Sequence, residues 1–369
     1  MKKISDIARR NKLYIFLIAF IVGINLLVFA GWMAERSEET PKGSRATGEV
    51  KTESAVGDQP LQPEEKKIFD EEDIEAREKK LRELATEDPS LYLFLGVLNL
   101  MILFVILIGL ILDIYFLMRW FRKSPVGMQR AGQERPRWSI GDVVRVTLIF
   151  ISFGYAFTIL QAFVAKLFPI LYNENFRMVF NTAMMNVVGI SVILYFVAKK
   201  YGQDIDTLGL TASKFANNVF YAVVGYIALV PVLLVIMIAT FFVTKLVKYQ
   251  PPIQPIVQVF IEEKNTSVLW LSALFAAIFG PIAEEIFFRG FMYTAIRKRL
   301  GVFWAMMTTA VIFSLLHTHI VGFLPIMVLG LLLAYLYEKT GSLVASMSVH
   351  IIHNLGMVIL VFLMRYVGV

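Results

Sequence analysis

The stretch "WLSALFAAIFGPIAEEIFFRG", residues 270–290, decides how this chain folds. Its first half is apolar enough to lie in a membrane, and its second half places two adjacent glutamates and an arginine after it. Charged side chains are costly within a bilayer, so those that occur in membrane helices are by default candidates for function. The positions of Glu284, Glu285 and Arg289 therefore need an explanation, and the rest of the sequence gives their setting.

The composition is that of a membrane protein. The 369 residues are 57% hydrophobic and 18% charged, whereas a soluble domain has about 25% charged residues. Several nearly uncharged runs exceed the roughly 18 residues that cross a hydrocarbon core. Open strands cannot satisfy their backbone in lipid, so we expect an all-α polytopic membrane protein with about nine transmembrane helices.

The nine predicted segments divide the chain into four regions. The segments are 13–33, 91–117, 142–168, 176–198, 217–244, 268–288, 302–318, 320–337 and 343–364. The regions are a membrane anchor (1–33), an acidic loop with a charged helix (34–90), a second membrane helix with a basic loop (91–141) and a core of membrane helices (142–369).

Lysine and arginine predict the topology. Five basic residues precede the first segment, and the loop after the second segment is also basic. The net charge of +7 therefore reports orientation and not nucleic-acid binding. By the positive-inside rule the N-terminus is cytoplasmic in a cytoplasmic (inner) membrane, and the acidic loop is extracytoplasmic. The first segment is long for a cleaved signal peptide, the alternative, and no A-x-A site follows it.

Three consecutive segments carry polar residues at one helical spacing. Glu285 and Arg289 stand four residues apart with the acid first, the better order for an ion pair, and Glu284 points about 100° away. "FSLLHTH" spaces Phe313 and His317 in the same way, and "HIIHN" spaces His350 and Asn354. His319 is only two residues past His317 and points elsewhere if the helix continues, and His353 is either a neighbour of His350 or a lipid-edge residue.

These residue types suit hydrolysis. A carboxylate with an imidazole can deprotonate water, while a second imidazole and an amide stabilise an oxyanion. Two alternatives remain open at this point: the charges are topology anchors at the headgroups, or the histidines are packed core residues. The absence of cysteine excludes thiolate chemistry and disulfides.

The three motifs EExxxR, FxxxH and HxxxN, in this order, resemble the CAAX-protease and bacteriocin-processing family, also called Abi or type II CAAX prenyl endopeptidase-like proteins. The resemblance covers residues 268–358 and extends more loosely back to about 140. It implies that region 142–369 is the core of an intramembrane endopeptidase.

The resemblance also implies site roles. Glu284 would be the general base with His317 as its partner, His350 and Asn354 would form the oxyanion site, and Glu285, Arg289 and Phe313 would support them. We expect no cofactor, because the compact zinc motif HExxH is missing. A zinc site of Glu284, His317 and His350 is the alternative.

Two other functions fit the sequence less well. A non-catalytic scaffold or immunity protein of this fold would tolerate replacement of the motif residues, and all are present. A transporter would be favoured by an internal repeat, and we find none. We expect a membrane-associated peptide or protein substrate in the lipid bilayer. The same set of residues is compatible with a prenylated C-terminus, a leader peptide or a sorting tail as the substrate.

The topology can be tested by cysteine labelling, because the natural chain has no background thiol. We expect Ser54→Cys to react with a membrane-impermeant maleimide in intact cells. Labelling only after permeabilisation would show that the acidic loop is cytoplasmic.

Overall fold

The computed structural model describes residues 12–38, 79, 82–83, 86, 88–123, 135–249, 251, 254–317 and 320–367. Every regular element within these ranges is a helix, which confirms the predicted all-α class. His319 and most of the acidic region lie outside the described residues, so the charged helix expected there stays a prediction.

Eight helical segments of the described chain are long and apolar enough to cross a membrane. The prediction of about nine counted 268–288 and 302–318 separately, and both fall within the segment Thr266–Leu316, which is counted once although it holds two helices that meet at a kink. Its 51 residues would measure about 76 Å as one straight helix, far more than the roughly 30 Å hydrocarbon core. The helix is interrupted at Gly301, whose φ of 81° is a conformation that glycine adopts without strain.

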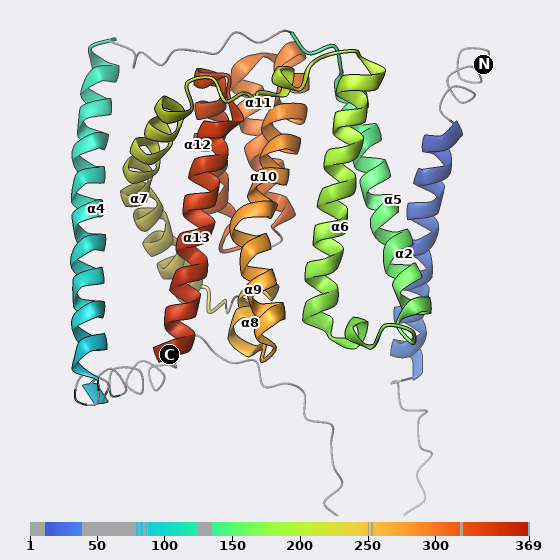
Figure 1. Cartoon of the computed structure of the whole chain (residues 1–369), viewed down its shortest axis with the longest axis horizontal. Helices are drawn as coiled ribbons and strands as arrows, with labels where there is room; N and C mark the ends of the chain where they lie inside the picture. The colour runs from blue at the N-terminus through green and yellow to red at the C-terminus, as the bar shows by residue number, and fades with distance from the viewer. Residues whose placement is uncertain are drawn as a thin grey trace, which may run out of the picture.

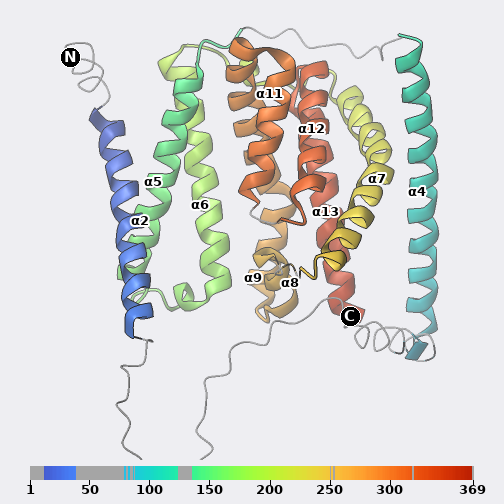
Figure 2. The ribbon, with the colours of Figure 1, turned by 180° about the vertical axis from the view of Figure 1, so that it is seen from behind.

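The C-terminal helices occupy the centre of the molecule, and two groups flank them (Figure 1). The main helices are α2 (Lys12–Glu38), α4 (Pro89–Phe121), α5 (Ile140–Val164), α6 (Glu174–Leu194), α7 (Phe215–Leu246), α8 (Pro255–Glu262), α9 (Thr266–Leu274), α10 (Gly280–Glu285), α11 (Thr294–Leu316), α12 (Phe323–Thr340) and α13 (Leu343–Val367). On one side α2 packs on α5, and α5 packs on α6. On the other side α7 packs on α12 and α13, and α4 covers α7 (Figure 2).

One edge of the molecule collects the basic ends of the helices. The first turn of α2 and the last turn of α4 lie on this edge (Figure 1). The buried carboxylate of Asp142, at the start of α5, accepts hydrogen bonds from Lys200 and Tyr201. Lys298 reaches the same edge and donates to the carbonyl of Pro136 over 3.0 Å. The shared edge agrees with the predicted topology, and which side of the membrane it faces stays a prediction.

At the opposite edge of the molecule, α8 and the residues that follow it link α13 to α6. Arg365 of α13 donates to the carbonyls of Phe260 and Glu263, both over 2.8 Å. The carboxylate of Glu263 accepts from the backbone N–H of Asn265 and from the side chain of Asn175 on α6. The hydrogen bond from Asn265 is the main reason that the pKa of Glu263 is lowered.

The contact between α4 and α7 depends on Gly109. A Cβ atom at this position would lie 2.5 Å from the carbonyl oxygen of Ile227 and 2.6 Å from Pro231. We expect Gly109→Ala to separate the helices and to cost about 1–3 kcal/mol of stability, measured as a lower unfolding midpoint of the purified protein. Gly96→Ala is the control on the same helix, because a Cβ there meets nothing within 4 Å. Equal midpoints for the two variants would contradict this packing.

Candidate active site

The first motif is presented by a helix with an irregular backbone. A π-helical turn, η4 (Phe275–Phe279), precedes α10, and the N–H of Gly280 donates to Phe275 instead of Ala276. The next residue, Pro281, has no N–H to donate. The carbonyl of Ala276 is therefore left without a helical donor, and the side-chain amide of Asn354 supplies one over 2.8 Å. This bond ties the third motif to the segment that leads into the first.

Glu285 and Arg289, which stand four residues apart in the first motif, form a buried ion pair. Nη1 of Arg289 lies 2.6 Å from Oε1 of Glu285, and both side chains are completely buried. The guanidinium also donates to the carbonyl of Gly330 over 3.2 Å and lies 4.7 Å from the ring centre of Phe313. A buried charge needs such partners because it has lost its water. The predicted pairing is confirmed, and the pair is buried inside the protein.

His350 lies between the two glutamates. Its Nδ1 is 2.9 Å from Oε1 of Glu285, and its Nε2 is 3.7 Å from Oε2 of Glu284. An ionised carboxylate only accepts hydrogen bonds, so the Nδ1–H donates to Glu285. Ser346, one turn earlier on α13, also lies against the carboxyl group of Glu285. These contacts fix the imidazole with its second nitrogen toward Glu284.

The two adjacent glutamates have different environments. The side chain of Glu284 is 36% exposed, whereas that of Glu285 is fully buried. Oε2 of Glu284 has no hydrogen-bond donor among the described residues. Oε2 of Glu285 likewise has no hydrogen-bond donor among the described residues, so the two glutamates differ in exposure and in Oε1 of Glu285, which accepts from both Arg289 and His350.

The second motif places its aromatic ring between two imidazoles. The ring of Phe313 lies 4.7 Å from that of His317 and 5.5 Å from that of His350. His317 ends α11, and its Nδ1 lies 2.8 Å from the carbonyl of Phe313. The imidazole of His317 thus folds back toward the preceding turn of the helix. His317 is exposed and is not within ion-pair distance of Glu284.

A protein metal site needs several ligand side chains close together. Within the described ranges, no three His, Asp or Glu side chains gather closely enough to hold a metal ion. The alternative zinc set of Glu284, His317 and His350 stays a prediction. His319 lies outside the described residues.

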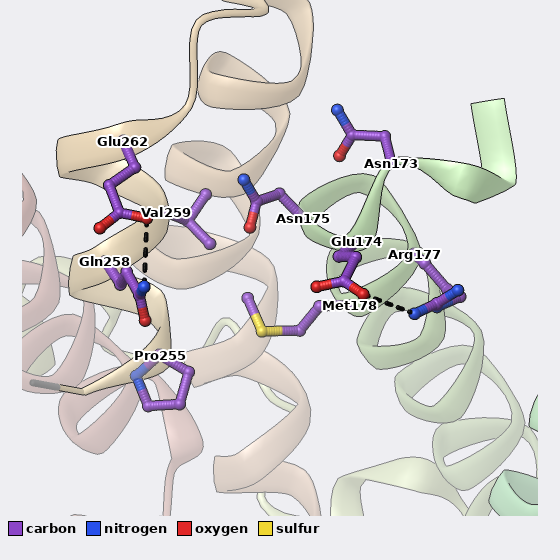
Figure 3. Close-up of a pocket in the computed structure, with 9 residues that line it drawn as sticks. All are labelled: Asn173, Glu174, Asn175, Arg177, Met178, Pro255, Gln258, Val259 and Glu262. Carbon is purple, nitrogen blue, oxygen red and sulfur yellow. Dashed lines mark hydrogen bonds and ion pairs between the residues drawn. The ribbon is translucent and has the colours of Figure 1, made fainter. Parts of the chain in front are cut away.

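Two hollows of the structure lie away from these motifs. One, of about 560 Å³, opens between the start of α6 and α8 and is lined by polar side chains such as Asn175 and Gln258 (Figure 3). The other, of about 460 Å³, lies beside the last turns of α7. Neither is lined by a residue of the three motifs, which form a packed polar cluster.

Two contributors to the cluster were not predicted from the sequence. Ser346 stands four residues before His350, a spacing that puts both on one face, so its signal was present in "SMSVH". Gly330 had no such signal, because its role is the close approach of α12. A Cβ there would lie 3.2 Å from Cα of Ala310 and 3.5 Å from the guanidinium of Arg289.

Comparison with known proteins agrees with the sequence motifs. Residues 266–356 match the family described as type II CAAX prenyl endopeptidase Rce1-like. Over 90 residues the chain is 30% identical to the Bacillus subtilis (strain 168) protein named "Putative membrane peptidase YdiL". That alignment covers 24% of this chain and 37% of the relative. No solved structure matches the chain. The C-terminal region thus has the predicted family resemblance.

The burial of Glu285 and Arg289 leads to a prediction about stability. Glu285→Gln leaves the guanidinium without its counter-charge, which typically costs about 3–5 kcal/mol for a buried pair. We expect low abundance of this variant in membranes and a low unfolding midpoint. Glu284→Gln changes a partly exposed side chain without such a pair and should accumulate normally. Normal stability of Glu285→Gln would show that the pair does not support the fold.

Proposed function

We propose that this chain, whose residues 266–356 match the Rce1-like family, is an intramembrane endopeptidase that uses water activated by Glu284. The observation that carries the proposal is the distance of 3.7 Å between Oε2 of Glu284 and Nε2 of His350. One water molecule can donate a hydrogen bond to each of two acceptors at this separation. In each such bond the heavy atoms lie only about 2.8 Å apart.

The proposed reaction has two steps. Glu284 takes a proton as the water oxygen attacks the peptide carbonyl carbon, and the carbonyl oxygen becomes an oxyanion. The C–N bond then breaks, and the proton held by Glu284 goes to the leaving amine. A general base within hydrogen-bond reach of its water contributes typically about 10²–10⁴-fold to the rate.

The neighbouring residues support this base in different ways. Glu285 holds the Nδ1–H of His350 and so leaves Nε2 free to accept a hydrogen bond from the water. The geometry thus favours His350 as the partner of Glu284, the role that the resemblance gives to His317. His317 keeps a free Nε2 across the ring of Phe313, and we retain it as a member of the site.

We propose a membrane-associated peptide or protein as the substrate. The motif helices lie in segments that are apolar enough to cross a membrane, and a substrate confined to the bilayer reaches such a site by lateral diffusion. The resemblance adds a prenylated C-terminus to the candidates. A leader peptide and a sorting tail fit the same cluster.

The proposal is tested by comparing the membrane proteomes of three strains. One lacks the protein, one carries Glu284→Gln, and one carries the unchanged protein. We expect the deletion and Glu284→Gln to accumulate the same uncleaved precursor. Cleavage by the variant should fall at least 10²-fold, because glutamine cannot take the proton. Glu262→Gln is the matched control, since this exposed glutamate on α8 contacts only Gln258 in the described structure.

Two outcomes would contradict the mechanism. Full cleavage by Glu284→Gln at normal abundance would reject Glu284 as the base. Loss of cleavage on chelation, restored by zinc, would make the enzyme a metallopeptidase and contradict the metal-free reaction.

A further inference from the structure

The hollow between the start of α6 and α8, here called the α6–α8 hollow, has the size of a ligand site. Its volume of about 560 Å³ lies within the range of about 300–1,000 Å³ that is usual for ligand pockets. It lies at the edge of the molecule opposite the basic edge (Figure 1). Nine residues line it: Asn173, Glu174, Asn175, Arg177, Met178, Pro255, Gln258, Val259 and Glu262.

A buried carboxylate behind the α6–α8 hollow fixes the asparagines of its α6 wall. Glu263 is 6% exposed, and the hydrogen bond from the Asn265 backbone lowers its pKa, so that it is ionised at neutral pH. Its Oε2 accepts from Nδ2 of Asn175 over 2.7 Å and from Nδ2 of Asn173 over 3.5 Å. An ionised carboxylate has no hydrogen to donate, so the nitrogen of each amide faces it. The oxygen of Asn175 is therefore left for the hollow.

The side chain of Asn175 points from α6 toward α8 (Figure 3). Gln258 on the α8 wall is held in a similar way, because its Nε2 donates to Oε2 of Glu262 over 3.1 Å. Neither Oδ1 of Asn175 nor Oε1 of Gln258 has a hydrogen-bond donor in the described part of the chain. Bonds within the protein thus engage the N–H groups of these amides and leave their oxygens as acceptors.

The charged residues of the lining add further acceptors. Glu174 and Glu262 contribute two carboxylates, and Arg177 is the one cation among the nine lining residues. Arg177 lies on the side of Glu174 away from α8 (Figure 3), and its Nη2 is 3.6 Å from Oε1 of Glu174. The Glu174 side chain is 86% exposed, and such a surface pair holds its partners only weakly. The lining therefore combines free acceptor oxygens with a net negative charge.

A lining of this kind suits a cation that carries several N–H donors. Guanidinium and ammonium groups are donors only, with five and three hydrogens respectively. An anion would find a single cationic donor, Arg177. A divalent metal ion needs several oxygen ligands at about 2.0–2.6 Å, and no three His, Asp or Glu side chains gather closely enough within the described ranges.

We propose that the α6–α8 hollow binds a guanidinium or primary ammonium group, carried by a basic side chain of a polypeptide or by a free polyamine. The hollow is distant from the three motifs. From Thr266, at the start of α9 beside α8, the helical segment rises about 27 Å to Glu284. A ligand in the hollow does not contact the proposed base, so this inference does not depend on the proposed function.

The first experiment measures whether the hollow selects this chemistry. The natural chain has no cysteine, so Met178→Cys provides a single thiol in its wall, in the whole chain in nanodiscs of neutral lipid. Three thiosulfonate reagents are compared: aminoethyl, trimethylammonium-ethyl, which has the same charge without N–H donors, and sulfonatoethyl, which is negative. Each rate is divided by that of Ser267→Cys, an exposed position at the start of α9.

We expect the aminoethyl reagent to react at least about tenfold faster than the sulfonatoethyl reagent, because a negative cleft concentrates cations. The trimethylammonium reagent should lie between them. Glu174→Gln together with Glu262→Gln should remove the preference at Met178→Cys. Pro255→Cys repeats the measurement from the α8 wall if Met178→Cys does not accumulate.

Two results of this experiment would overturn the proposal. Equal normalised rates for the aminoethyl and sulfonatoethyl reagents would show that the hollow is a solvated gap without selectivity. Equal rates for the aminoethyl and trimethylammonium reagents would show that charge alone is recognised and that the acceptor oxygens are not used.

The second experiment identifies the carrier of the cation. Labelling of Met178→Cys by uncharged N-ethylmaleimide is followed with four probes: the blocked peptide acetyl-Ala-Arg-Ala-amide, the same peptide with citrulline, spermidine, and calcium ions. Citrulline has the shape of arginine with a neutral urea group. We expect the arginine peptide and spermidine to slow labelling and the citrulline peptide to have no effect. The probe that protects at the lower concentration, the arginine peptide or spermidine, identifies a polypeptide or a polyamine as the carrier.

Three results here would also reject the cation site. Equal protection by the arginine and citrulline peptides would show that the charge is irrelevant. Labelling that neither the arginine peptide nor spermidine slows would show that no organic cation binds. Protection by calcium alone would make the hollow a metal site.

Discussion

The ion pair between Glu285 and Arg289 lies where neither side chain contacts solvent, and the surrounding helices are arranged to make that possible. Arg289 cannot lose its charge at any ordinary pH, so its environment has to supply acceptors. A carboxylate from the same helix, the carbonyl of Gly330 on α12 and the face of Phe313 on α11 do so. Replacing such a pair with apolar residues is often neutral for stability. Its function is therefore better sought in what it positions, and the group that it positions is His350.

The second constraint is the backbone around the first motif. Two π-helical turns, η4 and η5 (Ile286–Tyr293), flank α10 and leave carbonyl groups without their usual donors. Asn354 of the last helix supplies a donor to Ala276, and Trp138 adds one over 2.9 Å to the carbonyl of Phe291, which also accepts from Thr294. Such turns are frequent at functional sites. Here they explain why a polar residue of the last helix is fixed against the helix of the glutamates, since an unpaired carbonyl is costly in the membrane.

The sequence predicted those features that depend on local pattern. Apolar length identified the membrane helices, and helical spacing identified the pair of Glu285 and Arg289. The two predicted segments within Thr266–Leu316 correspond to the two helices that meet at Gly301. The contacts of His350 with both glutamates were out of reach. They depend on the rotation and height of α13 relative to α10, which no periodicity within either helix determines.

The two neighbouring glutamates show how one helix can provide two kinds of carboxylate. Residues next to each other in a helix point about 100° apart, so Glu285 faces the core and Glu284 faces its edge, where 36% of its side chain is exposed. The core glutamate has a fixed cation and a fixed imidazole, and its charge is needed for the fold. The edge glutamate has a single histidine at 3.7 Å, and the orientation of that histidine is set by the core glutamate. In the proposed reaction, a change in the protonation of Glu284 would therefore occur on a different side chain from the buried pair of Glu285 and Arg289.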